Sequence, residues 1–192
     1  MTAGLVLAAG AGTRFGEAPK QLADLHGRPL LQWAVDAQNG VAADVLHRIV
    51  VVLGAHASEI RPAIDFGRAQ VVVCPDWDRG QSWSLRRGLT ELRGEERVVV
   101  TLGDAPLVTP EVIARFAAEP PGTRAVYGGR PGHPVVLGPA HAAALAAHDD
   151  DQGARGLMRG ARTIEVGHLC CGRDVDTPED LEEVRDEARA NI

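Results

Sequence analysis

Short apolar runs alternate with amphipathic segments along the first 120 residues of the chain. Four runs are rich in valine or leucine and largely uninterrupted, and they cover residues 5–8, 48–54, 69–74 and 97–103. Such continuous runs are typical of strands buried on both faces of a parallel sheet. Apolar spacing or a proline suited to a first turn predicts helices between and after them, over residues 29–38, 82–92 and 109–119. This order predicts a three-layer α/β fold with a mostly parallel sheet.

The pattern changes in the C-terminal third of the chain. Two short apolar segments separated by glycine and proline predict a β-hairpin-like insertion over residues 122–138. Further elements are expected as helices over 140–148 and 154–160 and a strand over 163–167. A last helix is expected after Thr177, where Asp180 can close a capping box. Neither an internal repeat nor a low-complexity linker divides the chain, so one domain over residues 1–192 is predicted.

The charge, hydropathy and cysteine content of the chain limit the classes of ligand and partner that it can bind. The net charge of −6 gives no global basic field for nucleic acid, so an anionic ligand must be held by local cations and backbone amides. No apolar run approaches the roughly 20 residues of a membrane span, and the N-terminus does not resemble a signal peptide. The three cysteines, Cys74, Cys170 and Cys171, have no CxxC spacing, which argues against a disulfide framework or a zinc site. A cytoplasmic protein with reduced thiols is expected.

The loop after the first apolar run has the composition of a phosphate site. Gly10, Gly12 and Gly16 let the backbone approach an anion, and Arg14 and Lys20 can add charge-assisted hydrogen bonds. The spacing of a Walker A loop is absent, and the third glycine of a G-x-G-x-x-G fingerprint falls one residue late, at Gly16. A purely structural glycine turn is the alternative, and the two cations favour a binding role.

Acidic residues follow two later strand ends. Asp104 comes directly after the fourth apolar run, where its carboxylate suits a hard divalent cation such as Mg²⁺. A capping role is the alternative, but Thr109 already fits the cap of the next helix. Asp174 and Asp176 alternate on an extended run, so only one is expected to face the site, and Asp176 is the choice.

Polar residues after the third and fifth strands are further candidates. Gln81, Ser82 and Ser84 offer amide and hydroxyl groups for recognition of a base. Arg86 can meet a phosphate or lie on a solvated helix face. His133 stands in a glycine- and proline-rich loop, where it is either a surface residue or part of a loop that closes over a substrate.

Seven segments in order resemble the small nucleotidyltransferases of the molybdopterin-nucleotide type. They read "LAAGAGTRFG", "HGRPLLQWAV", "GQSWSLRRGL", "GDAPLVTPEVI", "GRPGHPVVL", "DDDQGARGLM" and "DVDTPEDL". Ala9 in "LAAG" is similar to the cytidylyl-transferring members, whereas guanylyl-transferring relatives typically read "LAGG". Phe15 stands where relatives often have Met, and the approach to Lys20 is slightly longer, so the reach of Lys20 is a point that a structure tests.

The resemblance implies a Rossmann-like nucleotidyltransferase fold with Mg²⁺ as cofactor and a small β-element on the acceptor side. The resemblance implies that Asp104 and Asp176 bind the metal. It implies that Lys20 and Arg14 bind the triphosphate and that these two residues form the catalytic set with Asp104. The residues implied for the nucleotide are Ala8, Ala9, Gly10, Gly12, Ser82 and Ser84, and those implied for the acceptor are His133, Arg86, Asp151 and Arg155. The implied reaction transfers CMP from CTP to the terminal phosphate of molybdopterin and releases pyrophosphate. The implied partners are CTP, a molybdopterin-type cofactor and a molybdoenzyme client or its chaperone.

Two alternatives remain open from the sequence. A related nucleotidyltransferase could use GTP or another phosphorylated acceptor, such as a sugar phosphate or methylerythritol phosphate. A non-catalytic carrier could instead bind the finished cofactor and deliver it. The combination of Asp104, Asp176 and Lys20 favours the enzyme, because a carrier has no need of a site for a metal and a triphosphate.

Overall fold

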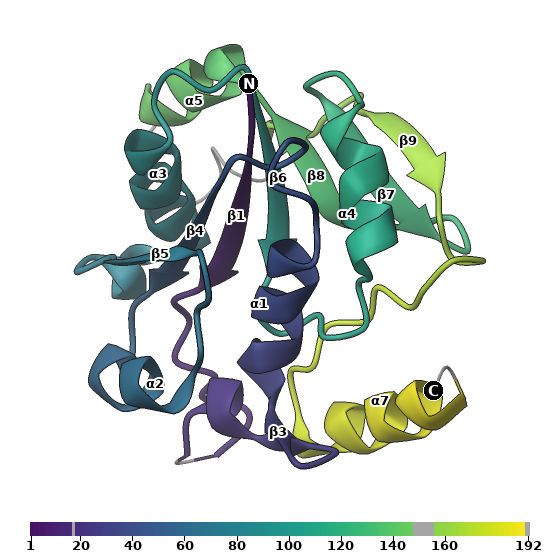
Figure 1. Ribbon diagram of the computed structural model, residues 1–192. Coiled ribbons are helices and arrows are strands. Elements are labelled where there is room, and N and C mark those ends of the chain that lie inside the picture. The colour runs from purple at the N-terminus through teal and green to yellow at the C-terminus, as the bar shows by residue number, and fades with distance from the viewer. Residues whose placement is uncertain (17, 148–155, 191–192) are drawn as a thin grey trace.

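A seven-stranded sheet forms the centre of the computed structural model, which describes residues 1–16, 18–147 and 156–190 (Figure 1). Its strand order is β5-β4-β1-β6-β8-β7-β9. The strands are β1 (Thr2–Ala8), β4 (Arg48–Leu53), β5 (Gln70–Val73), β6 (Arg97–Leu102), β7 (Thr123–Tyr127), β8 (Arg130–Leu137) and β9 (Arg162–Glu165). A separate two-stranded ribbon consists of β2 (Asp24–Leu25) and β3 (Arg28–Pro29). The four predicted apolar runs are therefore the strands β1, β4, β5 and β6.

The sheet is mostly parallel, as predicted. β1 pairs in parallel with β4 and β6, β4 pairs in parallel with β5, and β7 pairs in parallel with β9. β8 is antiparallel to both β6 and β7. Within the predicted insertion over 122–138, the antiparallel strands β7 and β8 extend the main sheet beyond β6. Glu165 holds the turn between β7 and β8 by accepting hydrogen bonds from the backbone N–H groups of Gly128 and Gly129, both at 3.0 Å.

Helices cover both faces of the sheet, which confirms the predicted three layers (Figure 1). They are α1 (Leu30–Asn39), α2 (Ala57–Ala63), α3 (Gln81–Glu91), α4 (Pro110–Ala117), α5 (Pro139–Ala146) and α7 (Pro178–Ala190), with short 3-10 turns at Lys20–Leu22 and Trp77–Arg79. Sequence reasoning missed α2, because this seven-residue helix contains Pro62 and buries only Ile60. Of the helix expected over 154–160, residues 157–160 form a turn, and residues 154–155 lie outside the described residues.

Alternate side chains of β1 enter different hydrophobic layers. Leu5 and Leu7 join the cluster that contains Leu85 and Leu89 of α3, whereas the intervening Val6 joins the cluster built around α1. This is the two-residue period of a strand that is covered on both faces. The first turn of α3 and the loop after β1 lie at the same end of the sheet.

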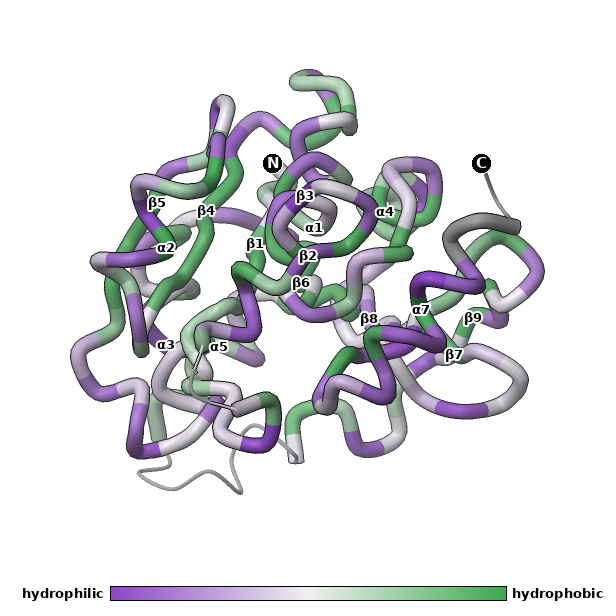
Figure 2. Tube along the Cα trace, turned by 90° about the horizontal axis from the view of Figure 1, so that it is seen from below, coloured by the Kyte–Doolittle hydropathy of each residue, from purple (hydrophilic) through white to green (hydrophobic). Residues whose placement is uncertain are grey.

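The C-terminal helix fixes the segment that precedes it. Thr177 and Asp180 form the predicted capping box, in which each side chain accepts a hydrogen bond from the other residue's backbone N–H. Leu181 and Val184 pack with Leu25 in a small hydrophobic cluster near the loop after β1. Figure 2 shows that the rest of α7 is largely hydrophilic, so the helix docks by one narrow apolar face. No helix among the residues described has the length and apolar character of a membrane span.

Candidate functional site

A hollow of about 180 Å³ lies beyond the carboxyl ends of β1 and β6. In open α/β sheets this is the edge at which ligands bind. The predicted residues that line it are Ala8, Ala9, Gly10, Gly12, Lys20, Ser84 and Asp104. The topology therefore brings the glycine-rich loop, the first acidic residue and the start of α3 around one cavity.

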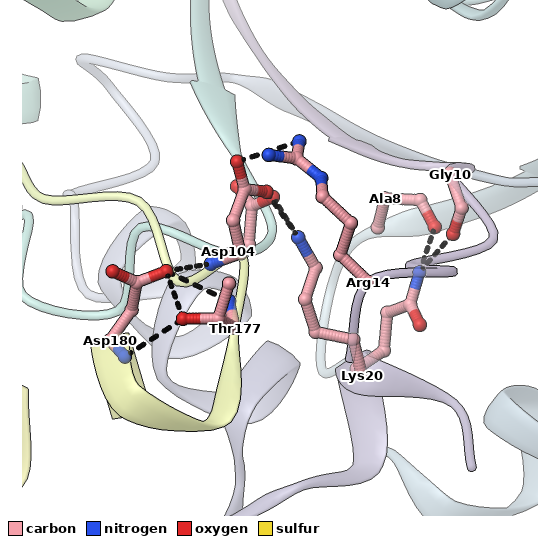
Figure 3. Close-up of polar contacts among 9 residues, drawn as sticks. Ala8, Gly10, Arg14, Lys20, Asp104, Thr177 and Asp180 are labelled. Carbon is pink, nitrogen blue, oxygen red and sulfur yellow. Dashed lines mark hydrogen bonds and ion pairs between the residues drawn. The ribbon is translucent and has the colours of Figure 1, made fainter. Parts of the chain in front are cut away.

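Lys20 is the buried centre of this group. Its residue exposure is only 7%, and its Nζ lies 2.7 Å from Asp104 Oδ2 and 3.1 Å from Asp176 Oδ1 (Figure 3). Burial lowers the pKa of Lys20, but the two carboxylates outweigh burial and raise it above its ordinary value. The lysine therefore carries its charge, and the longer approach through "GEAP" still allows it to reach the strand-end acids.

Gly12 makes room for this lysine. Its φ is +64°, in the left-handed region, and a Cβ atom added there would lie 2.9 Å from Lys20 Cβ. At Gly10, by contrast, an added Cβ would meet no atom within 4 Å. Gly10 and Gly12 therefore have different roles, and of these two only Gly12 is required by the packing of the protein itself.

Asp176 is the acidic residue of its segment that contacts the cations. Besides Lys20, it pairs with Arg14, whose guanidinium lies 3.0 Å from Asp176 Oδ2. Its backbone N–H donates to Asp180 Oδ2 at 3.0 Å, so the capping box of α7 also holds the backbone that carries Asp176. The Asp176 carboxylate is thereby set against the loop after β1, although the two segments lie far apart in the sequence.

The acidic residues leave one oxygen available for a cation. Asp104 Oδ1 is buried and accepts no hydrogen bond from the protein, while Oδ2 accepts from Lys20. A buried carboxylate oxygen without a donor is unfavourable unless a ligand satisfies it. The described residues contain no group of three or more His, Cys, Asp or Glu side chains arranged as a metal cage. A site of one or two carboxylates fits Mg²⁺, which keeps water and phosphate oxygens as its other ligands.

Asp174 adds negative charge beside this pair. Desolvation and the nearby carboxylates of Asp104 and Asp176 raise the pKa of Asp174 to about 7, and Lys20 only partly opposes them. Asp174 makes no ion pair with Lys20 or Arg14, in line with the expectation that Asp176 faces these cations. The acids at this edge form a patch whose charge a divalent cation would neutralise.

Gln21 is a residue of the site that sequence reasoning missed. Its Nε2 donates to the backbone oxygens of Ala8, at 3.2 Å, and Gly10, at 2.7 Å, which are labelled in Figure 3. The amide thus braces the loop that lines the hollow. The signal in the sequence that could have indicated Gln21 was its position directly after Lys20.

Two of the predicted residues lie away from the hollow. Ser82 is fully buried at 0% exposure, whereas Gln81 and Ser84 line the cavity. Successive helical residues are rotated by about 100°, so Ser82 and Ser84 cannot share a face, whereas Gln81 and Ser84 do. Arg86 donates to the backbone oxygen of Leu145 at 2.9 Å and so joins α3 to α5. Ser82 and Arg86 therefore do not line this hollow, and their contacts with the base and the acceptor stay predictions.

His133 lies in a second hollow, of about 320 Å³. This hollow borders the first, because Leu7 and Gln81 line both. Burial, with a smaller effect of the charge on Arg124, lowers the pKa of His133 to about 4, so its imidazole is neutral at pH 7. The other two predicted acceptor residues, Asp151 and Arg155, lie outside the described residues.

Comparison with known proteins finds matches over most of the chain. The profile of a family described as MobA-like NTP transferase domain matches residues 4–166. A relative named nicotine blue oxidoreductase, from Paenarthrobacter nicotinovorans, is 31% identical over 193 residues, covering 93% of each chain. The crystal structure of Rv0371c from Mycobacterium tuberculosis H37Rv has a TM-score of 0.83 at 29% identity and covers 96% of this chain and 97% of that one. The structure of Rv0371c with manganese has a TM-score of 0.79 at 27% identity and covers 96% and 98%.

Proposed function

The chain belongs to the MobA-like NTP transferase family, and on that premise we propose that it transfers CMP from CTP to the terminal phosphate of a molybdopterin-type cofactor. The observation that carries the proposal is the pairing of Lys20 and Arg14 with strand-end carboxylates beside the glycine-rich loop. Ala9 supports CTP over GTP as the donor. The product would pass to a molybdoenzyme or its chaperone in the cytoplasm.

The chain's own residues would act by positioning and charge. Lys20 and Arg14 exchange their carboxylate partners for oxygens of the triphosphate, and the backbone from Ala8 to Gly12 lines the path of the nucleotide. Gln81 and Ser84 offer polar groups to the base, and Trp77 forms an apolar wall of the same hollow. These groups hold the α-phosphorus in reach of the acceptor and stabilise the charge that develops there.

The acceptor supplies its own nucleophile. A phosphate monoester has a second pKa of about 6, so near neutral pH it carries an anionic oxygen without help from an enzyme base. This oxygen forms a bond to the α-phosphorus in line as the bond to the bridging oxygen of pyrophosphate breaks. No covalent intermediate with a protein side chain is required.

Asp104 and Asp176 would hold a divalent cation, and we propose Mg²⁺. The unpartnered Asp104 Oδ1 and the crowding of carboxylates support a cation at this edge, and the relative Rv0371c has been crystallised with manganese. The bound ion would neutralise charge on the phosphates of the nucleotide.

Pyrophosphate release by Asp104→Asn tests this function. Purified protein is incubated with molybdopterin and each nucleoside triphosphate, and products are identified by mass. Wild type is expected to form the cytidylyl product, and Asp104→Asn to lose about 100-fold or more of the rate. Asp44→Asn, at an exposed acid far along the sequence from the hollow, is the matched control. Full activity of a folded Asp104→Asn variant would overturn the metal role, and cofactor binding without pyrophosphate release would favour the carrier.

The relative named nicotine blue oxidoreductase supports a second candidate, which is reduction of a small organic substrate by a related site. This reaction needs an electron donor, and the loop after β1 lacks the G-x-G-x-x-G spacing of common dinucleotide-binding folds. Oxidation of a reduced nicotinamide dinucleotide, with no pyrophosphate formed from any triphosphate, would favour this candidate over nucleotidyl transfer.

A further inference from the structure

The second hollow contains a cation that the functions described so far do not use. Arg124 on β7 lines it together with His133 and Gln81, and most of the remaining wall is apolar, including Leu85 and Met158. The imidazole of His133 is neutral at pH 7. Arg124 is therefore the charged side chain among the described residues that line this hollow.

Arg124 has no counter-charge among the residues described. Its Nε is buried and has no hydrogen-bond partner, and no described carboxylate lies within ion-pair distance of its guanidinium. Desolvation lowers its pKa, and no neighbouring acid opposes the effect. A guanidinium nevertheless stays protonated in proteins, so the hollow retains a partly desolvated positive charge. Such an arrangement costs stability unless a ligand anion completes it.

The fold holds this charge in place. Arg124 pairs with Val135 of β8 on one side and with Thr163 of β9 on the other. Its neighbours Thr123 and Ala125 are fully buried. The backbone of Arg124 is therefore held between two strands, and the residue lines the hollow that borders the proposed nucleotide site.

We propose that Arg124 binds an oxyanion of the acceptor substrate, a phosphate group in particular, while the uncharged body of the acceptor rests on the apolar wall of the second hollow. The planar fork of a guanidinium matches two oxygens of a phosphate. The inference deepens the proposed function and rests on it, since it names the residue that binds the phosphate of the acceptor and the surface that receives the rest of the acceptor.

Binding of phenyl phosphate tests the inference without any turnover. This probe combines a phosphate with an apolar ring, and its affinity is measured by calorimetry for wild type, Arg124→Met and Lys20→Met. Arg124→Met is expected to lose about tenfold or more in affinity for phenyl phosphate while keeping its affinity for CTP. Lys20→Met is expected to show the opposite pattern. Arg115→Met, at an exposed position of α4, is the control and should change neither.

The outcomes separate the inference from the proposed function. Unchanged phenyl phosphate binding by Arg124→Met would overturn the inference. Unchanged CTP binding by Lys20→Met would count against the proposed function alone. Because Arg124→Met removes a partly desolvated charge with no acidic partner among the described residues, its melting temperature should hold or rise. A fall would indicate a structural role, and Arg124→Gln, which keeps donors but no charge, must then still weaken phenyl phosphate binding for the inference to stand.

Discussion

Lys20 donates a hydrogen bond from Nζ to Asp104 Oδ2 over 2.7 Å, from a position that is almost fully buried. The predicted triphosphate ligand and the predicted metal ligand are therefore paired with each other in the free protein. Under the proposed function, Lys20 would exchange this carboxylate for a triphosphate oxygen, while Asp104 would bind the cation through its unpartnered Oδ1. In the free protein Lys20 neutralises part of the negative charge of these carboxylates, which makes it a competitor of the cation.

This competition predicts an unusual effect of Lys20→Met. The affinity of the free protein for Mn²⁺ should rise about tenfold, because Asp104 and Asp176 lose the cation that neutralises them. Turnover of CTP should fall about 100-fold, because triphosphate charge is no longer stabilised. Titration with Mn²⁺ monitored by electron paramagnetic resonance measures the first effect. Arg28→Met, which breaks the separate pair with Asp36, should leave Mn²⁺ affinity unchanged; no gain in Lys20→Met would contradict the competition.

Gly12→Ala should destabilise the protein through the same lysine. The left-handed φ and the contact of 2.9 Å with Lys20 Cβ predict a loss of about 1–2 kcal/mol in the free energy of unfolding. Gly10→Ala is the matched control in the same loop, and it should cost little because its Cβ would meet no neighbour. Urea denaturation of both variants makes the comparison, and equal stabilities would show that the loop adapts freely.

His133 should make stability depend on pH. Its native pKa is about 4, below the ordinary value of 6.5, so the unfolded chain takes up a proton first as the pH falls. The contribution of a neutral His133 is complete above pH 6.5 and is lost progressively towards pH 4, by on the order of 2–3 kcal/mol. Melting temperatures across this range should therefore fall less steeply in His133→Asn than in wild type. His168→Asn, at an exposed site, should retain the wild-type slope.

The capping box of α7 should influence the site at a distance. Asp180→Ala removes the acceptor for the N–H groups of Asp176 and Thr177, with an expected loss of about 1 kcal/mol in stability. Because the backbone of Asp176 is then less constrained, Mn²⁺ affinity should also fall, although Asp180 has no contact with Lys20 or Arg14. Asp186→Ala on the same helix is the control for the helix itself. Loss of stability with intact Mn²⁺ affinity would restrict the capping box to a structural role.

Much of this architecture was predictable because buried apolar residues recur in the sequence with the pattern of the strand or helix that contains them. The unbroken valine runs identify β4 and β6, and Thr109 and Thr177 identify helix starts by the chemistry of their caps. The helix α2 was not predictable in this way, since it buries a single residue and leaves no apolar stripe.

The position of a candidate side chain could be predicted where its segment follows a strand end, as at Lys20 and Asp104. It was not predicted where the outcome depends on helical rotation or on partners distant in sequence. Ser82 turns into the core while Gln81 faces the hollow. From the sequence, Arg124 is an ordinary strand residue. Its lack of an acidic partner among the described residues is found only when β8 and β9 are placed beside it.

The antiparallel pairing of β8 with β6 also restricts how the distance between the two hollows can change in evolution. Val100 of β6 pairs with Val135 of β8, and both side chains line the second hollow. Side chains keep their face of the sheet only when a strand slips by two residues, which is a step of about 7 Å. The separation between the two hollows therefore cannot be adjusted gradually in evolution. New acceptors would be accommodated by exchanging single side chains on a fixed frame, and position 124 is one at which a single exchange changes the charge of the hollow.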